Sequence, residues 1–345
     1  MDWRMPAETD PHDRTWLAWP SSGYTLGDTP AAAEEARRVW GSVANAVAEF
    51  EPVTVVADPD HAAVAARYLS GDVEIRTAPL DDAWVRDTGP SFVIGTEPEG
   101  GQRLGAVTWT FNGWGAQDWA SWDNDRLLGA TIAEWAGAER VDSQLVNEGG
   151  AIHVDGEGTV LLTETVQLDP HRNPGIRHDD VEAELARTIG AATAIWLPRG
   201  LTRDSERFGT RGHVDLLATF PTPGAVLLHQ QNDDAHPDSA ISAQLAERLT
   251  GAADASGRAL EIIELPAPQR LRDAEGFVDY SYVNHLVVNG GVIACGFDDP
   301  NDEAAAHILA EAYPGRTVRT IDARALFARG GGIHCITQQQ PALPH

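Results

Sequence analysis

One cysteine near the end of the chain stands in a setting that favours chemistry. Cys335 follows three consecutive glycines in the segment ARGGGIHCITQQQP, at the expected start of a strand. Glycines let a backbone approach a ligand closely, so this thiol could be presented in a crowded pocket. A lone cysteine is more often a small buried hydrophobic residue, and Cys295 in VIACGF fits that description. Cys335 therefore needs partners to be a candidate nucleophile.

A histidine and an aspartate lie two residues apart in the segment RGHVDLLATF. His213 and Asp215 fall on a predicted strand, so both side chains point to the same face. A histidine can carry a proton, and a carboxylate can hold a cation. The apolar residues that follow place the pair near the core, where an unpartnered carboxylate would be costly.

Two further acidic residues stand beside turns. Asp87 lies before Gly-Pro in DDAWVRDTGPSF, and Glu148 precedes Gly-Gly in VNEGGAIHV. Each alone could be an ordinary turn residue. Together with the residues above, they make a set of one thiol, one histidine and three carboxylates at turns or strand ends.

Several kinds of chemistry compete for this set. Metal binding fits poorly, because only His213 and Cys335 are soft ligands and the sequence has no CxxC or HxxxH spacing. A cysteine protease or amidase needs one orienting group and leaves two carboxylates unused. Carboxylates around a thiol raise its pKa unless a cation binds between them, and a planar guanidinium is the cation they hold best. The set favours a hydrolase that acts on a guanidinium group.

The elements that must position these residues alternate between short β-branched strands and Ala/Glu-rich helices, which indicates an α/β protein. Strands are predicted at 53–57, 106–111, 151–154, 160–163, 194–197, 214–220, 225–228, 286–288, 292–295 and 333–337. Helices are predicted at about 31–50, 61–69, 123–136, 179–188, 238–249, 301–312 and 323–327.

A unit of two strands around a glycine-containing turn, followed by a helix, recurs along the chain. It appears at 147–164, at 212–229 and at 284–297. Such units suggest a repeat and not a doubly wound sheet. If they pack around an axis, polar residues at their strand ends meet at the centre. No long linker divides the sequence, so we expect residues 1–345 to form a single catalytic domain.

The composition limits the partners of this chain. Its 25 basic and 52 acidic residues give a formal net charge of −27 and a pI of about 4.6. This charge disfavours nucleic acid and favours encounter with small cations. The sequence lacks an export signal and any apolar stretch of the ~20 residues that span a bilayer, so we expect a cytoplasmic protein without a membrane partner. A homo-oligomer is compatible with the sequence.

Seven motifs in order resemble those of agmatine deiminases, members of the guanidino-group-modifying (pentein) superfamily that includes peptidyl-arginine deiminases. The motifs are MPAETDPHDRTWLAWP (5–20), DDAWVRDTGPSFV (81–93), FNGWG (111–115), NEGGAIHVDGEGTVLLTE (147–164), GHVD (212–215), SYVN (281–284) and ARGGGIHCITQQQP (328–341). The resemblance runs nearly end to end. It implies a five-bladed, pseudo-symmetric α/β propeller of ββαβ-type repeats around a central active site.

The resemblance also implies roles for the candidate residues. Cys335 would be the nucleophile, His213 the general acid and base, Asp87 with Asp215 the clamp for the guanidinium, and Glu148 a support for the histidine. No metal or organic cofactor is expected. The implied reaction converts agmatine to N-carbamoylputrescine and ammonia through an S-alkylthiouronium on Cys335, a step in putrescine biosynthesis.

The site for the rest of the substrate is predicted from three further residues, Trp84, Trp114 and Arg211. Arg211 departs from the family, which usually carries an acidic or amide residue there. An arginine facing the pocket would repel an amine and attract a carboxylate. A deiminase of a guanidino acid or another arginine derivative is therefore an alternative. An amidinotransferase and a non-catalytic guanidine-binding module are the more distant ones.

Overall fold

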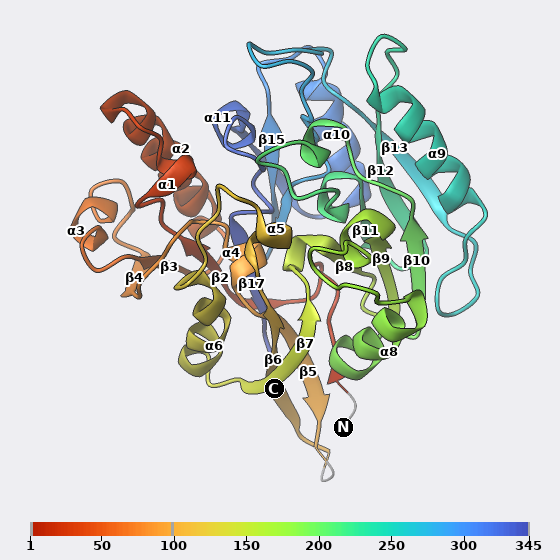
Figure 1. Cartoon of the computed structure of the whole chain (residues 1–345), viewed down its shortest axis with the longest axis horizontal. Coiled ribbons are helices and arrows are strands. Elements are labelled where there is room, and N and C mark those ends of the chain that lie inside the picture. Colours follow the sequence, from red (N-terminus) through yellow and green to blue (C-terminus); the bar gives the residue numbers. More distant parts are fainter. Residues whose placement is uncertain (1–2, 98–99, 344–345) are drawn as a thin grey trace.

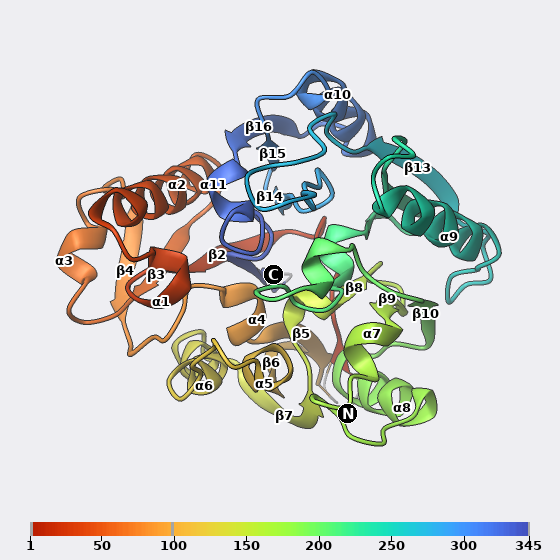
Figure 2. The same ribbon diagram turned by 45° about the horizontal axis from the view of Figure 1, so that its top comes forward.

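Five small β-sheets stand around a central axis, each with a helix on its outer side (Figure 1). The ring is clearest in Figure 2, where α2, α6, α8, α9 and α10 lie at the periphery. The structure is a computed structural model, and it describes residues 3–97 and 100–343.

All five sheets share one pattern, which the third sheet illustrates. Strand β11 (Ala218–Thr222) pairs antiparallel with β12 (Ala225–Gln230), helix α9 (Asp238–Thr250) follows, and β13 (Glu261–Pro266) then pairs parallel with β12. Parallel neighbours require a crossover, which the helix provides. The predicted α/β fold of ββαβ-type repeats is confirmed, and it has five blades.

The remaining elements complete the other blades. The first blade contains β17 (Thr337–Pro341), β2 (His12–Ala18), α2 (Pro30–Ala48), β3 (Val53–Ala57), α3 (Ala62–Ala65) and β4 (Val73–Thr77). The second contains β1 (Trp3–Arg4), β5 (Ser91–Thr96), β6 (Gln102–Thr110), α6 (Asp125–Trp135) and β7 (Glu139–Val146). The fourth blade contains β8 (Ile152–Val154), β9 (Thr159–Thr163), α8 (His178–Ile189) and β10 (Thr193–Leu197). The fifth contains β14 (Leu286–Val288), β15 (Gly291–Gly296), α10 (Asp302–Ala312) and β16 (Thr317–Asp322).

Short helical turns lie between strands and long helices within the blades or connect one blade to the next. They are α1 (Gly23–Leu26), α4 (Val85–Thr88), α5 (Gly113–Ala116), α7 (Glu164–Gln167), α11 (Arg324–Phe327) and the 3₁₀ turns η1 (Gly149–Ala151), η2 (Arg203–Ser205) and η3 (Val214–Leu216).

Local sequence explains where the long helices begin and end. Thr29 accepts a hydrogen bond from the backbone N–H of Ala32, and Pro30 occupies the first turn of α2, where no N–H is needed. In α8, Val181, Leu185 and Ile189 recur four residues apart and are buried, so this face packs on the sheet. Gly190 ends α8 in the left-handed conformation, with φ 71°.

The first blade joins the two ends of the described chain. Strand β17 pairs antiparallel with β2, and β2 pairs parallel with β3. Strand β3 is buried along its whole length and consists of VTVVA, which suits a central strand covered on both faces. The strand that follows Cys335 is thus held by the sheet that starts at His12.

Three predicted elements differ from the structure. The strand expected at 214–220 starts only at Ala218, because η3 precedes it, and the strand expected at 333–337 starts only at Thr337. The same-face argument for His213 and Asp215 is therefore wrong, since both lie at a tight turn. The helix expected at 61–69 is regular only over Ala62–Ala65.

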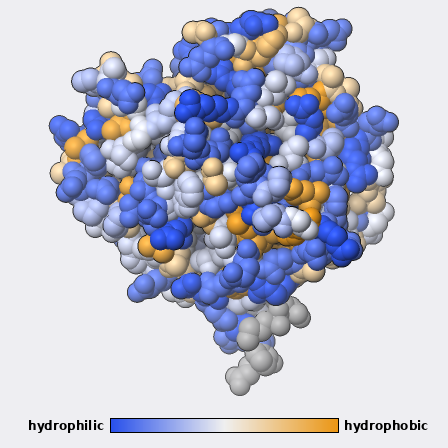
Figure 3. Space-filling view, in the orientation of Figure 1, coloured by the Kyte–Doolittle hydropathy of each residue, from blue (hydrophilic) through white to orange (hydrophobic). Residues whose placement is uncertain are grey.

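The third strands of most blades escaped prediction because they carry many charges. Strand β16 reads TVRTID and has no buried residue, and β7 reads ERVDSQLV with a buried residue only at alternate positions. Both lie at the outer edge of their sheets. Hydrophilic residues also cover most of the face seen in Figure 3. None of the helices in the described residues is long and apolar enough to cross a membrane.

Candidate active site

Residues from several blades meet at a small cavity near the axis. It has a volume of about 20 Å³, and its lining includes Cys335, Asp87, Trp84, Trp114 and Phe208. A volume of this size holds about one water molecule. A larger hollow of about 690 Å³ lies beside α6 and does not include Cys335.

Gly150 marks the point where three predicted site residues converge. A methyl group on this glycine would lie 2.5 Å from Nδ1 of His213 and 3.0 Å from both Oδ2 of Asp215 and Oδ1 of Asp87. The backbone N–H of Gly150 donates a hydrogen bond of 3.1 Å to Oδ1 of Asp87. The absence of a side chain at position 150 therefore lets the imidazole and the two carboxylates approach one another.

The Cys335 thiol is buried and lies in the turn directly before β17. Its Sγ atom is 3.5 Å from Oδ2 of Asp215 and accepts a hydrogen bond of 3.3 Å from Nδ2 of Asn284. Burial, together with Asp215 and Asp87, raises the pKa of the thiol well above its ordinary value. Gly331 makes room for the sulfur, since a methyl group there would lie 3.0 Å from Sγ. In the free protein this thiol is protonated at neutral pH.

Asp87 is held by an unusual backbone segment as well as by Gly150. Trp114 Nε1 donates a hydrogen bond of 2.8 Å to Oδ2 of Asp87. Trp114 has a φ of 54° between two glycines that also have positive φ, and Asn112 accepts a hydrogen bond from Gly115 N. The FNGWG motif thus aims an indole N–H at the carboxylate. Burial raises the pKa of Asp87 to about 6, although His213 opposes this shift.

His213 lies between two carboxylates. Its Nε2 atom is 3.3 Å from Oε2 of Glu148, and its Nδ1 atom is 3.7 Å from Oδ1 of Asp87. Burial alone would lower the pKa of His213, but Asp87, Glu148 and Asp215 outweigh it and raise the pKa to about 9. The imidazole is therefore protonated at neutral pH and can act as an acid.

Asp215 belongs to a buried chain of charges that continues away from the cavity. Its Oδ2 atom is 2.8 Å from Nδ1 of His334, and Nε2 of His334 is 2.8 Å from Oε1 of Glu8. Both ring nitrogens of His334 face carboxylates, so both donate and the ring carries a positive charge. Burial opposes the shift, but His334 lowers the pKa of Asp215. Oδ1 of Asp215 finds no hydrogen-bond partner within the described chain.

Glu148 is fully buried and is paired on two sides. Arg172 Nε donates hydrogen bonds of 3.0 Å and 3.2 Å to its two oxygens, and His213 contacts it as described. Burial would raise the pKa of Glu148, but Arg172 and His213 lower it. Arg172 also donates to Oδ2 of Asp169 and to the carbonyl of Thr210. This network fixes the histidine from the side opposite Asp87.

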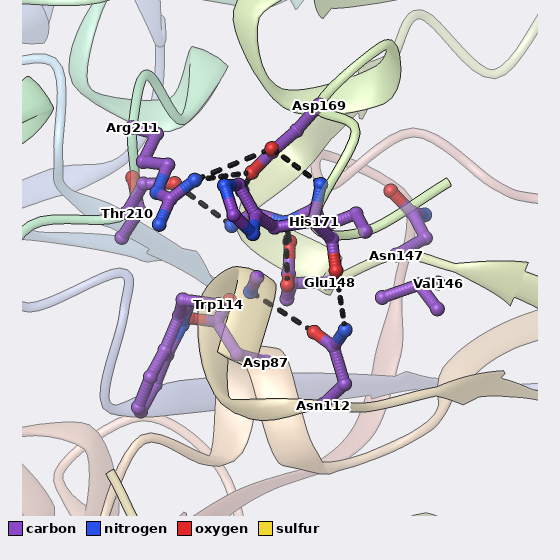
Figure 4. A network of polar contacts seen from close by, with 12 residues as sticks. Asp87, Asn112, Trp114, Val146, Asn147, Glu148, Asp169, His171, Thr210 and Arg211 are labelled. Atoms are coloured by element: carbon purple, nitrogen blue, oxygen red, sulfur yellow. Dashed lines mark hydrogen bonds and ion pairs between the residues drawn. The ribbon is translucent and has the colours of Figure 1, made fainter. Parts of the chain in front are cut away.

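The structure places Arg211 differently from the other predicted residues. Its Nη1 atom donates to both oxygens of Asp169, at 3.2 Å and 3.0 Å, as Figure 4 shows. About a third of the side chain is exposed, and Arg211 is not among the residues that line the cavity. Trp84 and Trp114 do line it. Because Arg211 is paired with Asp169, it does not supply the unpaired positive charge that the sequence suggested for the pocket.

Four residues of this constellation received no role from the sequence. Glu8, Asn284 and His334 stand inside the motifs quoted above, so the motifs themselves were the available signal. Arg172 lies outside them, and nothing in the sequence pairs it with Glu148. Within residues 3–97 and 100–343, no group of three or more His, Cys, Asp or Glu side chains is arranged to hold a metal ion.

The arrangement offers binding and chemistry in one place. The free Oδ1 of Asp215 and the carboxylate of Asp87 can accept hydrogen bonds from a cation with several N–H groups. Cys335 lies 3.5 Å from Asp215 and lines the same cavity as Asp87, and His213 lies 3.7 Å from Asp87. A planar cation held by the carboxylates would thus lie against the sulfur.

Comparisons with known proteins agree with this geometry. The family model of the Porphyromonas-type peptidyl-arginine deiminases matches residues 4–341. The chain belongs to this deiminase family. It is 56% identical to a putative agmatine deiminase of Streptomyces coelicolor over 99% of each chain. It is 41% identical to an agmatine deiminase of Stutzerimonas stutzeri over 98% of this chain and 95% of that one.

A solved structure of the same family shares the fold. An agmatine deiminase of Enterococcus faecalis, in a structure described as catalysing its reaction, superposes with a TM-score of 0.90. The two chains are 31% identical, and the match covers 99% of this chain and 96% of the other. The pentein-type architecture expected from the resemblance is thereby confirmed.

Proposed function

We propose that this protein is an agmatine deiminase, a hydrolase that converts agmatine and water to N-carbamoylputrescine and ammonia. One observation carries the proposal: His213, Asp87 and Asp215 converge beside Gly150, Cys335 lies 3.5 Å from Asp215, and Oδ1 of Asp215 has no hydrogen-bond partner among the described residues. The names of the relatives point in the same direction. The catalytic unit would be a single domain in the cytoplasm, as the sequence predicts.

The first half of the reaction uses the carboxylates and the thiol. Asp87 and Asp215 hold the guanidinium plane, and the bound cation lowers the pKa of the Cys335 thiol, so that its proton passes to solvent and a thiolate forms next to its target. The sulfur attacks the central guanidinium carbon and forms a tetrahedral adduct. His213 gives its proton to one amino group, which leaves as ammonia. The product of this step is an S-alkylthiouronium on Cys335.

The second half returns the enzyme to its starting state. Neutral His213 accepts a proton from water, which attacks the same carbon. Collapse of this adduct breaks the carbon–sulfur bond, and the hydroxyl group loses its proton as the ureido carbonyl forms. Protonation of the released thiolate restores the thiol of the free enzyme. Glu148 and Arg172 keep the imidazole in place through both transfers. His213 thus serves as acid and then as base, as its two flanking carboxylates allow.

Ammonia release from a panel of guanidines tests the proposal. The panel contains agmatine, arginine, a peptidyl-arginine and guanidino acids, without an added amine acceptor. We expect agmatine to be preferred and Cys335→Ala to abolish release. Full activity of Cys335→Ala would rule out the nucleophile and the mechanism, and a requirement for an amine acceptor would indicate an amidinotransferase.

One observation bears on the alternative substrates. A guanidino acid would need a free cation in the pocket, and Arg211 is instead paired with Asp169 outside the cavity lining. The structure therefore favours agmatine over a guanidino acid. Efficient turnover of guanidino acids, with little turnover of agmatine, would reverse this preference.

A further inference from the structure

A second small chamber adjoins the cavity of Cys335. We call it the acidic chamber; its lining includes Tyr24, Arg203, Phe208, Glu275, Asp279 and Gly330. Phe208, Gly209 and Gly330 line both spaces, so these residues form part of the wall between them. The volumes are about 30 Å³ and about 20 Å³.

Asp279 is an unusual carboxylate. Only 7% of the residue is exposed, and no described residue donates a hydrogen bond to it, with Oδ1 completely shielded. Buried polar groups in proteins are nearly always hydrogen-bonded, and an unpaired buried charge is costly. Burial, assisted by Asp204, raises the pKa of Asp279 to about 7 although Arg203 opposes this shift. Among the described residues, this carboxylate has no cationic partner bonded to it, although Arg203 acts on it from a distance.

The arginine nearest to Asp279 cannot supply that partner. Arg203 Nη1 lies 2.6 Å from Oδ2 of Asp273, and its Nη2 lies 2.9 Å from Oε2 of Glu275. Its single charge already faces two carboxylates. Arg207 on the same wall pairs with Asp118 at 3.8 Å. The lining itself holds two arginines and two carboxylates, but Asp273 and Asp118 also pair with these arginines, so four carboxylates face two cations. The surroundings of the chamber thus suit a ligand ammonium.

Phe208 and Gly330 approach each other closely in the wall between the two spaces. Phe208 has a φ of 72°, in the left-handed region, and its ring stacks on Tyr24 with centroids 4.1 Å apart. Gly330 allows a close approach, since a methyl group there would lie 2.8 Å from the carbonyl oxygen of Phe208. No side chain fits at Gly209 either, because it would meet the backbone of Asp204. Phe208 therefore lies on the boundary between the two spaces.

We propose that the acidic chamber, with Asp279 as its acceptor, binds the cationic tail of the substrate while the guanidinium lies at Cys335. The proposal rests on the proposed function and adds the site that selects the substrate tail. An aliphatic chain would pass the ring of Phe208, and its ammonium would satisfy the oxygens of Asp279. Guanidines with an uncharged tail would lack this contact.

Two guanidines that differ only in the tail test the proposal. Agmatine ends in an ammonium, and n-butylguanidine ends in a methyl group. Asp279→Asn keeps the shape of the side chain and removes its charge. We expect it to lower kcat/KM for agmatine by about 10- to 100-fold, mainly through KM, as for loss of a hydrogen bond between charged groups. Its kcat/KM for n-butylguanidine should stay within about twofold, since that substrate lacks the charge.

A matched control separates local binding from general attraction of cations. Asp118→Asn removes one charge from the same region, but Asp118 is exposed and does not line the acidic chamber. It should leave the preference for agmatine over n-butylguanidine unchanged. Equal losses on both substrates in Asp279→Asn, or no loss on either, would overturn the tail site.

The outcomes also separate this inference from the proposed function. If the unaltered protein releases ammonia from both guanidines with equal efficiency, the tail site is wrong and the deiminase assignment stands. If it releases ammonia from neither, the proposed function fails. Asp279→Asn should fold at least as stably as the parent at pH 8, because it removes an unpaired buried charge. Asp279→Ser is the second variant, should the first fail to fold.

Discussion

Nδ1 of His334 lies 2.8 Å from Oδ2 of Asp215, so the residue next to Cys335 in the chain holds the carboxylate that lies beside its sulfur. Glu8 binds the other ring nitrogen at 2.8 Å. The imidazolium of His334, with a carboxylate at each ring nitrogen, lowers the pKa of Asp215 and keeps it ionised despite its burial. The charge of the cavity is thus set partly by residues that do not line it.

Replacing His334 should shift the pH dependence of catalysis. In His334→Phe the carboxylate loses its donor, so the pKa of Asp215 rises and the acid limb of kcat/KM moves to higher pH. His334→Asn can place an amide N–H near the position of Nδ1 and should restore part of the shift. Profiles of kcat/KM from pH 5 to 9 distinguish the variants. A uniform loss at every pH, equal in both, would indicate a purely structural role for His334.

Gly150→Ala should abolish most activity while leaving the fold intact. The added methyl group would lie 2.5 Å from Nδ1 of His213 and displace the imidazole from Asp87 and Asp215. A displacement of about 1 Å can cost about 100-fold in rate, so we expect at least that loss in kcat/KM. Gly71→Ala is the control, because nothing lies within 4 Å of a methyl group there. Equal activities of the two variants would contradict the convergence at Gly150.

The Cys335 thiol should ionise only when a cation is bound. Its pKa is raised by burial, Asp215 and Asp87, so thiolate absorbance near 240 nm should be absent at pH 8. Added guanidinium chloride, at low concentration, should restore it, whereas potassium chloride should not. The measurement uses Cys295→Ala, which removes the other thiol. Thiolate at pH 7 without guanidinium would show that the carboxylates do not control the sulfur.

Arg172→Met should destabilise the protein strongly. It would leave the buried Glu148 without its arginine, while Asp169 keeps Arg211, and breaking a buried ion pair costs about 3–5 kcal/mol. Arg187→Met removes a pair that is half exposed, with Glu184, and should cost less than about 1 kcal/mol. Urea unfolding of both variants compares the free energies of unfolding. Similar losses would mean that Glu148 does not depend on Arg172.

The sequence predicted which residues gather at the candidate site better than it predicted their backbone conformation. Five residues were expected near the axis, and the structure brings them together: Cys335, His213, Asp87, Asp215 and Glu148. They could be found because residue types and motifs are read from the sequence without knowing the local backbone conformation. The backbone itself was less predictable. The expected strands around His213 and Cys335 are turns, since their apolar residues pack against the core without a partner strand.

Long-range ion pairs could not be predicted from the sequence either. Arg172 and Glu148 are 24 residues apart, and Glu8 and His334 are 326 residues apart. Periodicity reports only on neighbours along one element, so neither pair leaves a signal in a single sequence. The unpaired state of Asp279 was equally hidden, because it depends on which donors fail to reach it.

The pairing of β17 with β2 has a consequence for biosynthesis. The fourth strand of the first blade is Thr337–Pro341, and Cys335, the proposed nucleophile, stands two residues before it. During synthesis, β2, β3 and α2 therefore leave the ribosome long before β17 can cover the edge of β2. An uncovered strand edge favours association with other chains. The nascent protein cannot be an active hydrolase until Cys335 and β17 have emerged. Catalysis and protection of this edge should therefore appear together, as the last event of folding.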